Sequence, residues 1–228
     1  MVPGMAAGRS AASTVAVLVL AACLAPGARA ARGAGALAPY RDLARGPAAA
    51  RVLALARSAM EGHWSGAAPD TAGVPDWPGE PAALYVSLVR GHVTRACVGS
   101  PAPPRGTLAE SVRELALAVL ASDTRRPPVR RDELAGLRIV VAFAGPGEPV
   151  ADPARVDVAR EGLLVGGPDR HVAFLPGEAR TAAWAVREAR RVGALEPGTP
   201  PEYQRFDVVT VIEPEKKPPG GGSPDEED

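Results

Sequence analysis

The amino-acid sequence predicts an α+β fold, in which a mostly antiparallel sheet is flanked by helices. Two pairs of short β-rich segments carry this prediction, because a turn joins the members of each pair into a hairpin. The first pair is 83–89 and 93–99, joined at Arg90-Gly91, and the second is 162–165 and 171–175, joined at 166–169. Strands that arrive as hairpins, with helices between them, favour an antiparallel sheet over a series of parallel βαβ units.

Three segments have the pattern of amphipathic helices. Gly46-Pro47 opens the first, since proline is tolerated in the first turn of a helix. The second begins with the capping box Thr107 to Glu110, and the third is 180–192. Their apolar sides are Val52, Leu55, Ala56, Ala59 and Met60; Leu108, Val112, Leu115, Ala116, Val119 and Leu120; and Ala183, Trp184, Val186 and Ala189.

The remaining segments complete the predicted domain. Arg138 to Ala144 (RIVVAFA) is a strand closed by Gly145-Pro146-Gly147, and Phe206 to Ile212 is a last strand. Residues 65–80 contain too much Pro, Gly and Asp for regular structure. Asp132 to Leu137 is expected to make a short turn or helix.

The first residues have the features of an export signal. Arg9 precedes the apolar run Thr14 to Ala22, which is shorter than the about 20 residues needed to span a bilayer and is typical of a signal peptide. The run ends in Leu20-Ala21-Ala22-Cys23, which resembles the site where bacterial lipoproteins are cut and lipidated on the cysteine. We therefore expect residues 1–22 to be a lipoprotein signal peptide, and Cys23 to anchor an exported protein to a membrane facing the periplasm or cell surface.

Two other interpretations of this segment remain open. Ala28-Arg29-Ala30 is a site for ordinary signal peptidase, and cleavage after Ala30 would release a secreted protein. Alternatively, the segment is an Ala-rich extension of a cytoplasmic protein. In the lipoprotein interpretation, the domain boundaries are a flexible tether at 23–39, a folded domain at 40–212 and a disordered acidic tail at 213–228 (EPEKKPPGGGSPDEED).

Composition limits the possible partners. The formal net charge is zero, so no strong field would attract nucleic acid, and we expect no nucleic-acid partner. The chain has two cysteines, Cys23 and Cys97. If Cys23 is lipidated or removed, no disulfide can form, and Cys97 is an unpaired thiol that must be buried or used.

The segment Thr94-Arg95-Ala96-Cys97-Val98-Gly99-Ser100 resembles the L-R-G-C-I-G-[ST] motif of the AMMECR domain family. The resemblance extends from about Leu53 to Val211. Further matches are the helix 108–120, Asp123 to Pro128 (DTRRPP) for D-x-R-F-P-P, the strand 138–143 for I-x-V-S-V, and 161–176 for d-G-L…L-L-P. The chain departs from the family at Thr94, Ala96, Arg126 and Gly177, which stand where the family has Leu, Gly, Phe and Gln.

The resemblance implies an α+β domain in which the antiparallel sheet and a smaller subdomain meet at a cleft near the motif. It implies no established activity, and the association of cytoplasmic members with Memo-like and radical-SAM proteins does not transfer to an exported member. The residues expected near a ligand are Arg95, Cys97, Gly99, Ser100, Pro127 and Pro128.

Cys97 is the best candidate for a catalytic residue. Arg95 shares its strand face and could lower the pKa of the thiol, although cysteine is also a common buried residue. A catalytic base would have to be His63, His92 or His171, and we expect His92, beside the hairpin turn, and His171, at the start of a strand, to be solvent-exposed. Arg95 could instead bind an anion or form an ion pair with an acid such as Glu110 or Glu114. No Cys/His pair has the spacing of metal ligands, so we expect no metal site and no cofactor.

Three hypotheses for function follow. The first is an envelope-anchored, non-catalytic domain that binds a small ligand or protein partner in the cleft near Arg95 and Cys97. The second is an enzyme that uses Cys97 as a nucleophile or redox centre. The third is a scaffolding lipoprotein whose acidic tail makes the contact.

Overall fold

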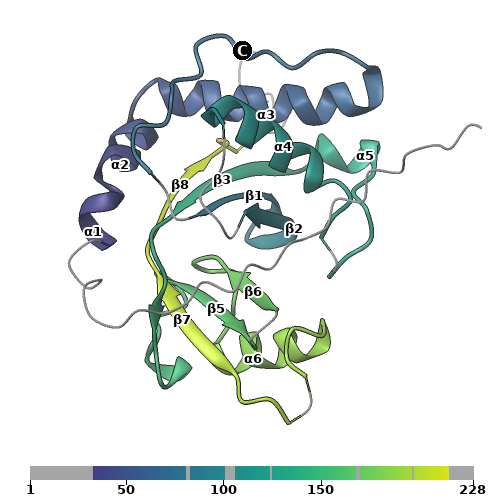
Figure 1. Cartoon of the computed structure of the whole chain (residues 1–228). Coiled ribbons are helices and arrows are strands. Elements are labelled where there is room, and N and C mark those ends of the chain that lie inside the picture. The colour runs from purple at the N-terminus through teal and green to yellow at the C-terminus, as the bar shows by residue number, and fades with distance from the viewer. Residues whose placement is uncertain are drawn as a thin grey trace, which may run out of the picture.

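Two four-stranded antiparallel sheets pack against each other, each with helices on its other side (Figure 1). The computed structural model describes residues 33–215 except 81, 82, 101–105, 124, 168, 169 and 197. Its elements are α1 (Gly33–Ala36), α2 (Ala38–Arg45), α3 (Ala48–Ser65), β1 (Ala83–Arg90), β2 (Val93–Ser100), α4 (Leu108–Ala118), α5 (Arg131–Leu134), β3 (Arg138–Ala144), β4 (Glu148–Pro149), a 3₁₀ turn (Pro153–Arg155), β5 (Gly162–Gly166), β6 (His171–Phe174), α6 (Ala182–Arg191), β7 (Glu202–Phe206) and β8 (Val208–Ile212). The predicted α+β class is confirmed.

The first sheet has the strand order β2-β1-β3-β8. The predicted hairpin of β1 and β2 turns at Gly91, whose positive φ of 58° suits glycine. One face of this sheet packs against α3 and α4 (Figure 1). The predicted apolar stripes of both helices lie in the core between them and the sheet, and all five residues of the α3 stripe are buried. The capping box is present, with Thr107 and Glu110 each accepting from the other's backbone N–H.

The second sheet has the order β4-β7-β5-β6 and carries α6 on its outer face. It is the smaller subdomain that the family resemblance implied. Tyr85 of β1 stacks on Phe206 of β7, with ring centroids 6.2 Å apart, and Leu175 adds to this contact. The facing surfaces of the two sheets are therefore packed together here, where an open cleft was expected.

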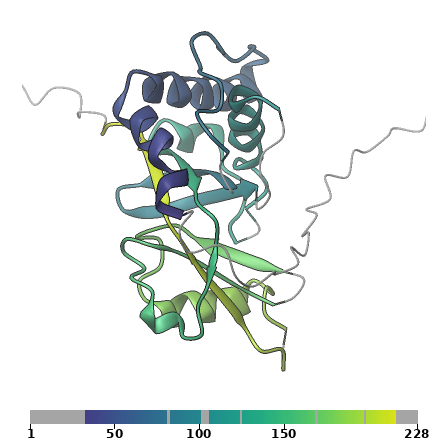
Figure 2. The ribbon, with the colours of Figure 1, turned by 60° about the vertical axis from the view of Figure 1, so that its left-hand side comes forward.

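The last strand differs from its prediction. Phe206 to Ile212 is not one strand, because Asp207 separates β7 of the second sheet from β8 of the first. Figure 2 shows the yellow ribbon of these strands passing from one sheet to the other. Gly145 donates its N–H to the Asp207 carbonyl at 2.9 Å, which fixes the crossing point. The short strand β4, at Glu148–Pro149 after β3, pairs with β7 and is not among the predicted strands.

Both predicted boundaries of the folded part are wrong. Residues 33–39 are predicted to belong to a tether, yet Leu37 is 1% exposed and lies in the main core. The tail was predicted from 213, yet Glu213 accepts hydrogen bonds from the Arg57 guanidinium and from the Ile139 N–H. Apolar burial at one end and a shielded ion pair at the other extend the domain in both directions.

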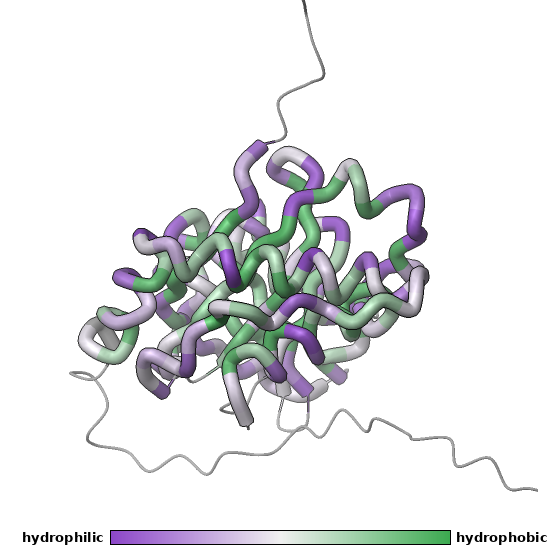
Figure 3. The backbone as a smooth tube through the Cα atoms, turned by 90° about the horizontal axis from the view of Figure 1, so that it is seen from above, coloured by the Kyte–Doolittle hydropathy of each residue, from purple (hydrophilic) through white to green (hydrophobic). Residues whose placement is uncertain are grey.

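The apolar side of α6 is shifted from the predicted one. The buried residues are Ala182, Ala185 and Ala189, whereas Ala183, which was placed on the apolar side, is exposed. Trp184, which was placed on the apolar side, does pack on Phe174 of β6. The prediction for α6 is therefore correct for some residues of the apolar side and wrong for Ala183. Figure 3 shows the hydrophobic segments, in green, gathered inside the chain's outer turns.

Candidate functional site

Strand β2 places the predicted site residues by simple alternation. Ala96 points to the main core under α4 and is 1% exposed. Arg95, Cys97 and Gly99 lie on the opposite face, as predicted from the sequence. The structure divides that face in two: Arg95 lies at an open hollow, while Cys97 and Gly99 lie beneath the second sheet.

Arg95 is held by α5 and by the segment that precedes it. Its Nε donates to Glu133 at 2.8 Å, and its two terminal nitrogens donate to the carbonyls of Pro127 and Pro128 at 3.1 and 3.2 Å. The expected ion pair is therefore present, but its partner is Glu133 and neither Glu110 nor Glu114. Glu110 is instead occupied in the capping box. The predicted residues Pro127 and Pro128 belong to the site as acceptors that fix Arg95.

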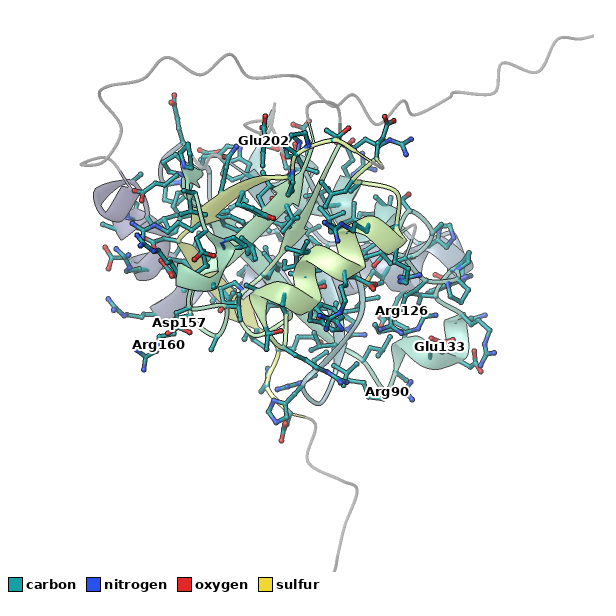
Figure 4. All side chains as sticks on the ribbon, turned by 90° about the horizontal axis from the view of Figure 1, so that it is seen from below. Arg90, Arg126, Glu133, Asp157, Arg160 and Glu202 are labelled. Carbon is teal, nitrogen blue, oxygen red and sulfur yellow. The ribbon has the colours of Figure 1, made fainter. Side chains whose placement is uncertain are left out.

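The hollow beside Arg95 is rich in guanidinium groups, and we name it the arginine hollow. Its volume is about 510 Å³, and it is open to solvent. The lining residues are Arg90, Val93, Thr94, Arg95, Arg126, Arg130 and Glu133. Figure 4 shows Arg90, Arg126 and Glu133 on the same side of the molecule, away from Asp157 and Arg160.

The four arginines of the hollow differ in how far they are neutralised. Arg95 and Arg130 both pair with Glu133, and Arg130 also pairs with Asp132. The side chains of Arg90 and Arg126 are exposed and, within the described residues, make no hydrogen bond or ion pair. Among these residues the hollow therefore presents two arginines without an ion pair, Arg90 and Arg126, beside two ion-paired ones, although Glu188 lies near enough to Arg126 to feel its charge.

Cys97 belongs to a different environment, a polar cluster formed with Asp123, Arg125, Glu178 and Ser87, in which Asp123 and Ser87 are buried and Cys97 is half-buried. Asp123 accepts from the Cys97 backbone N–H at 2.9 Å and from Arg125 through both of its oxygens. Arg125 also donates to Glu178 at 2.9 Å. Because Glu178 follows β6, this ion-paired chain connects the β2 strand to the second sheet's subdomain.

The charges of the cluster shift one another's ionisation. Burial opposes the charged form of Asp123, yet its hydrogen bonds and ion pair with Arg125 lower its pKa overall. Burial raises the pKa of Glu178, against the opposing effect of Arg125. The hydroxyl of Ser87, which is buried opposite Cys97 in the β1–β2 pairing, faces the thiol and favours its charged form.

The same surroundings make Cys97 a poor nucleophile. Burial, with the nearby carboxylate of Glu178, raises the pKa of the Cys97 thiol to about 12, although the Ser87 hydroxyl and Arg125 oppose the rise. Arg95, which was expected to lower that pKa, is committed to Glu133 instead. Within the described residues Cys97 forms no disulfide, and the structure gives it no histidine partner; His63 and His92 are exposed.

Gly99 and Ser100 have structural roles on this strand. They pair with Tyr85 and Leu84 of β1, so their backbones belong to the sheet. A Cβ on Gly99 would lie 2.0 Å from Tyr85 Cδ1, because the tyrosine ring crosses directly over this residue. Glycine is required here for close packing of the ring.

Two further kinds of partner to consider are metal ions and membranes. Among the described residues there is no group of three or more His, Cys, Asp and Glu side chains able to hold a metal ion. Within the same part of the chain, no helix has the length and hydrophobicity to cross a bilayer. Cys23, the predicted lipidation site, and the alternative cleavage site after Ala30 lie outside the described residues.

Sequence reasoning missed the residues that give the hollow its charge. Arg90 was assigned only to a turn, and Arg130 and Glu133 were not singled out. Arg126 was noticed as a departure from the family motif, where an apolar residue is usual. An arginine at that position, within the run Arg125-Arg126-Pro127-Pro128, was the available signal for a basic surface.

Comparisons with known proteins agree with the resemblance seen in the sequence. The AMMECR1 family model matches residues 53–208, more than half of the chain. An uncharacterised protein of Thermotoga maritima is 33% identical over 119 residues, covering 50% of this chain and 67% of the relative. One from Methanothermobacter thermautotrophicus is 29% identical over 161 residues, covering 66% and 82%. The crystal structure of the uncharacterised protein PH0010 from Pyrococcus horikoshii has the same fold, with a TM-score of 0.54 and 22% identity over 70% of this chain and 88% of that one.

Proposed function

The chain belongs to the AMMECR1 family. We propose that its domain is a binding module whose arginine hollow receives an anionic ligand. The observation that carries the proposal is the pair of exposed arginines, Arg90 and Arg126, that lack a partner within the described residues. The guanidinium group suits this role, because its fork of donors matches the oxygens of carboxylate and phosphate groups.

The neighbouring contacts support this assignment. Glu133 and two carbonyls hold Arg95 in place, so one wall of the hollow is rigid before a ligand arrives. A preorganised site loses less side-chain entropy on binding than a flexible one. Arg90 and Arg126 come from different segments, the hairpin turn and the loop after α4, so an anion between them would bridge two parts of the fold.

This proposal moves the site away from Cys97. The hypothesis of an enzyme with a Cys97 nucleophile needs a thiolate, and the raised pKa of this thiol disfavours one at neutral pH. The binding hypothesis needs only the hollow. It keeps the predicted neighbourhood of Arg95 and replaces Cys97 with Arg90 and Arg126 as the residues that would touch the ligand.

Isothermal titration of the full chain with pyrophosphate at low ionic strength tests the binding function. We expect a measurable affinity that falls at least about tenfold in the double variant Arg90→Ala, Arg126→Ala, because two direct charge contacts are lost. Arg160→Ala is the matched control, since Arg160 is an exposed arginine on the other side of the molecule (Figure 4). An affinity that the double variant leaves unchanged would refute the proposal.

We also propose that the domain works at a membrane, through a lipid on Cys23. Support comes from the order of Arg9, the apolar run 14–22 and the small residues before Cys23. Metabolic labelling with a radioactive fatty acid tests it in a bacterial host. Label is expected on the native chain and none on the Cys23→Ala variant; an unlabelled mature protein that begins at Ala31 would support ordinary secretion instead.

A further inference from the structure

We propose that the arginine hollow is the docking surface for the acidic segment Asp225-Glu226-Glu227-Asp228 of this same chain, an inference that rests on the anion-binding function proposed above. The segment carries four consecutive carboxylates, and the hollow presents Arg90 and Arg126, which form no ion pair within the described residues. Opposite charge alone does not select this occupant. The second reason is that the acidic segment is attached close to the hollow.

The described chain ends beside the hollow. Glu215 pairs with Arg138 at 3.7 Å, and the same guanidinium donates to the Gly91 carbonyl at 3.1 Å. Gly91 directly follows Arg90, which lines the hollow. The strand register also places the end of β8 near the end of β1. Val89 of β1 pairs with Arg138 and Ile212 of β8 pairs with Val140, so both strands end beside the start of β3.

The connection is long enough to reach across that end of the sheet. Three strand spacings separate β8 from β2, which amounts to about 14 Å at the usual spacing. Ten residues lead from Glu215 to Asp225 and can span about 33 Å when extended. The acidic segment can therefore enter the hollow without strain.

Attachment in the same chain makes the acidic segment a strong competitor. A short flexible linker gives a tethered group an effective concentration on the order of millimolar. Four carboxylates at that concentration would occupy Arg90 and Arg126 until a tighter anion displaced them. The tail would thereby set a threshold affinity for any external ligand of the hollow.

Neutralising the tail in the full chain tests the inference. The variant combines Asp225→Asn, Glu226→Gln, Glu227→Gln and Asp228→Asn, and pyrophosphate is titrated into it and into the native chain. We expect binding to tighten about tenfold in the variant, with the difference shrinking as salt screens the tail. Glu202→Gln with Asp157→Asn is the control, because it removes exposed carboxylates far from the hollow and should change nothing (Figure 4).

The outcomes separate the two proposals. Equal binding by the native and neutralised chains overturns tail docking and leaves the anion site standing. If neither chain binds pyrophosphate, the function proposed above fails, and carbodiimide crosslinking then judges the docking by itself. In the Arg126→Lys variant, crosslinks from position 126 to 225–228 within one chain support it, with Arg160→Lys as the control. Crosslinks that form only between two chains, or none, overturn it.

Discussion

The backbone N–H of Cys97 donates to Oδ2 of Asp123 at 2.9 Å, and this bond attaches the motif strand to a buried chain of charges. Asp123 binds Arg125, and Arg125 binds Glu178 in the other subdomain. Two stretches that the sequence matched to separate family motifs, at 94–100 and 123–128, therefore meet in one structural unit. The chain of ion pairs joins the two sheets, while the arginine hollow beside Arg95 remains open for a ligand.

Asp123→Asn should be among the more damaging single substitutions. The change removes the charge that faces Arg125 while leaving that guanidinium buried, and we expect the free energy of unfolding to fall by about 3 kcal/mol. Urea denaturation measures it. Asp157→Asn, at an exposed carboxylate, should cost under about 0.5 kcal/mol. Equal costs for the two variants would show that the buried chain contributes nothing.

Glu178 gives stability a distinct pH dependence. Because burial raises its pKa in the folded state, the folded chain holds this proton at a pH where the unfolded chain has released it. Stability therefore falls as pH rises from the unfolded pKa of about 4.3 through the folded one, and Glu178→Gln removes that fall. Urea unfolding of both proteins from pH 4 to 8 measures the difference.

Asp123 acts in the opposite sense. Its pKa is lowered, so its stabilisation is present above the unfolded value of about 3.9 and is lost as pH falls through the folded value. Keeping the measurement above pH 4 separates the two carboxylates. A difference between native and Glu178→Gln chains that stays flat from pH 4 to 8 would contradict the raised pKa of Glu178.

The thiol of Cys97 should be nearly inert in the folded protein. With its pKa raised to about 12, its thiolate fraction at neutral pH lies about a thousandfold below that of a free cysteine. A chromogenic disulfide reagent measures the labelling rate in a Cys23→Ser background, with the urea-unfolded chain as reference. Native labelling as fast as that of the unfolded chain would revive the hypothesis of a Cys97 nucleophile.

Gly99→Ala should destabilise the junction of the sheets. The added methyl would meet the Tyr85 ring, which must then leave its stack on Phe206, and we expect a loss of about 2 kcal/mol. Gly35→Ala is the comparison, since nothing lies within 4 Å of the added methyl and alanine favours a helix. Thermal melts of both variants check this. A melting temperature of the Gly99→Ala chain that matches the native one would mean that the ring gives way without cost.

Local patterns predicted most elements because their causes are local. The capping box fixes the start of α4, and glycine at position 91 fixes the first hairpin. Failures arose where a distant contact decides the outcome. Leu37 is buried because it packs in the core of the first sheet, which is distant in the sequence. The strand is interrupted at Asp207 because the chain passes there from the second sheet to the first.

The site was half predictable for the same reason. Strand alternation placed Arg95 and Cys97 on one face correctly, but it could not tell which part of that face the second sheet covers. Glu133 lies 38 residues further along the chain than Arg95, and no local pattern favours it over Glu110 or Glu114 as the partner of Arg95. Arg90 and Arg126 meet at the hollow only through the packing of the loop after α4 beside the hairpin turn.

An NMR titration of the ¹⁵N-labelled chain with pyrophosphate locates the anion-binding site. We expect chemical-shift changes to concentrate at Arg90, at Val93 to Arg95 and at 126–133, and the side-chain Nε–H signals of Arg90 and Arg126 to move furthest. Shifts centred on Cys97 and Glu178, or on the far side near Arg160, would contradict the proposed site.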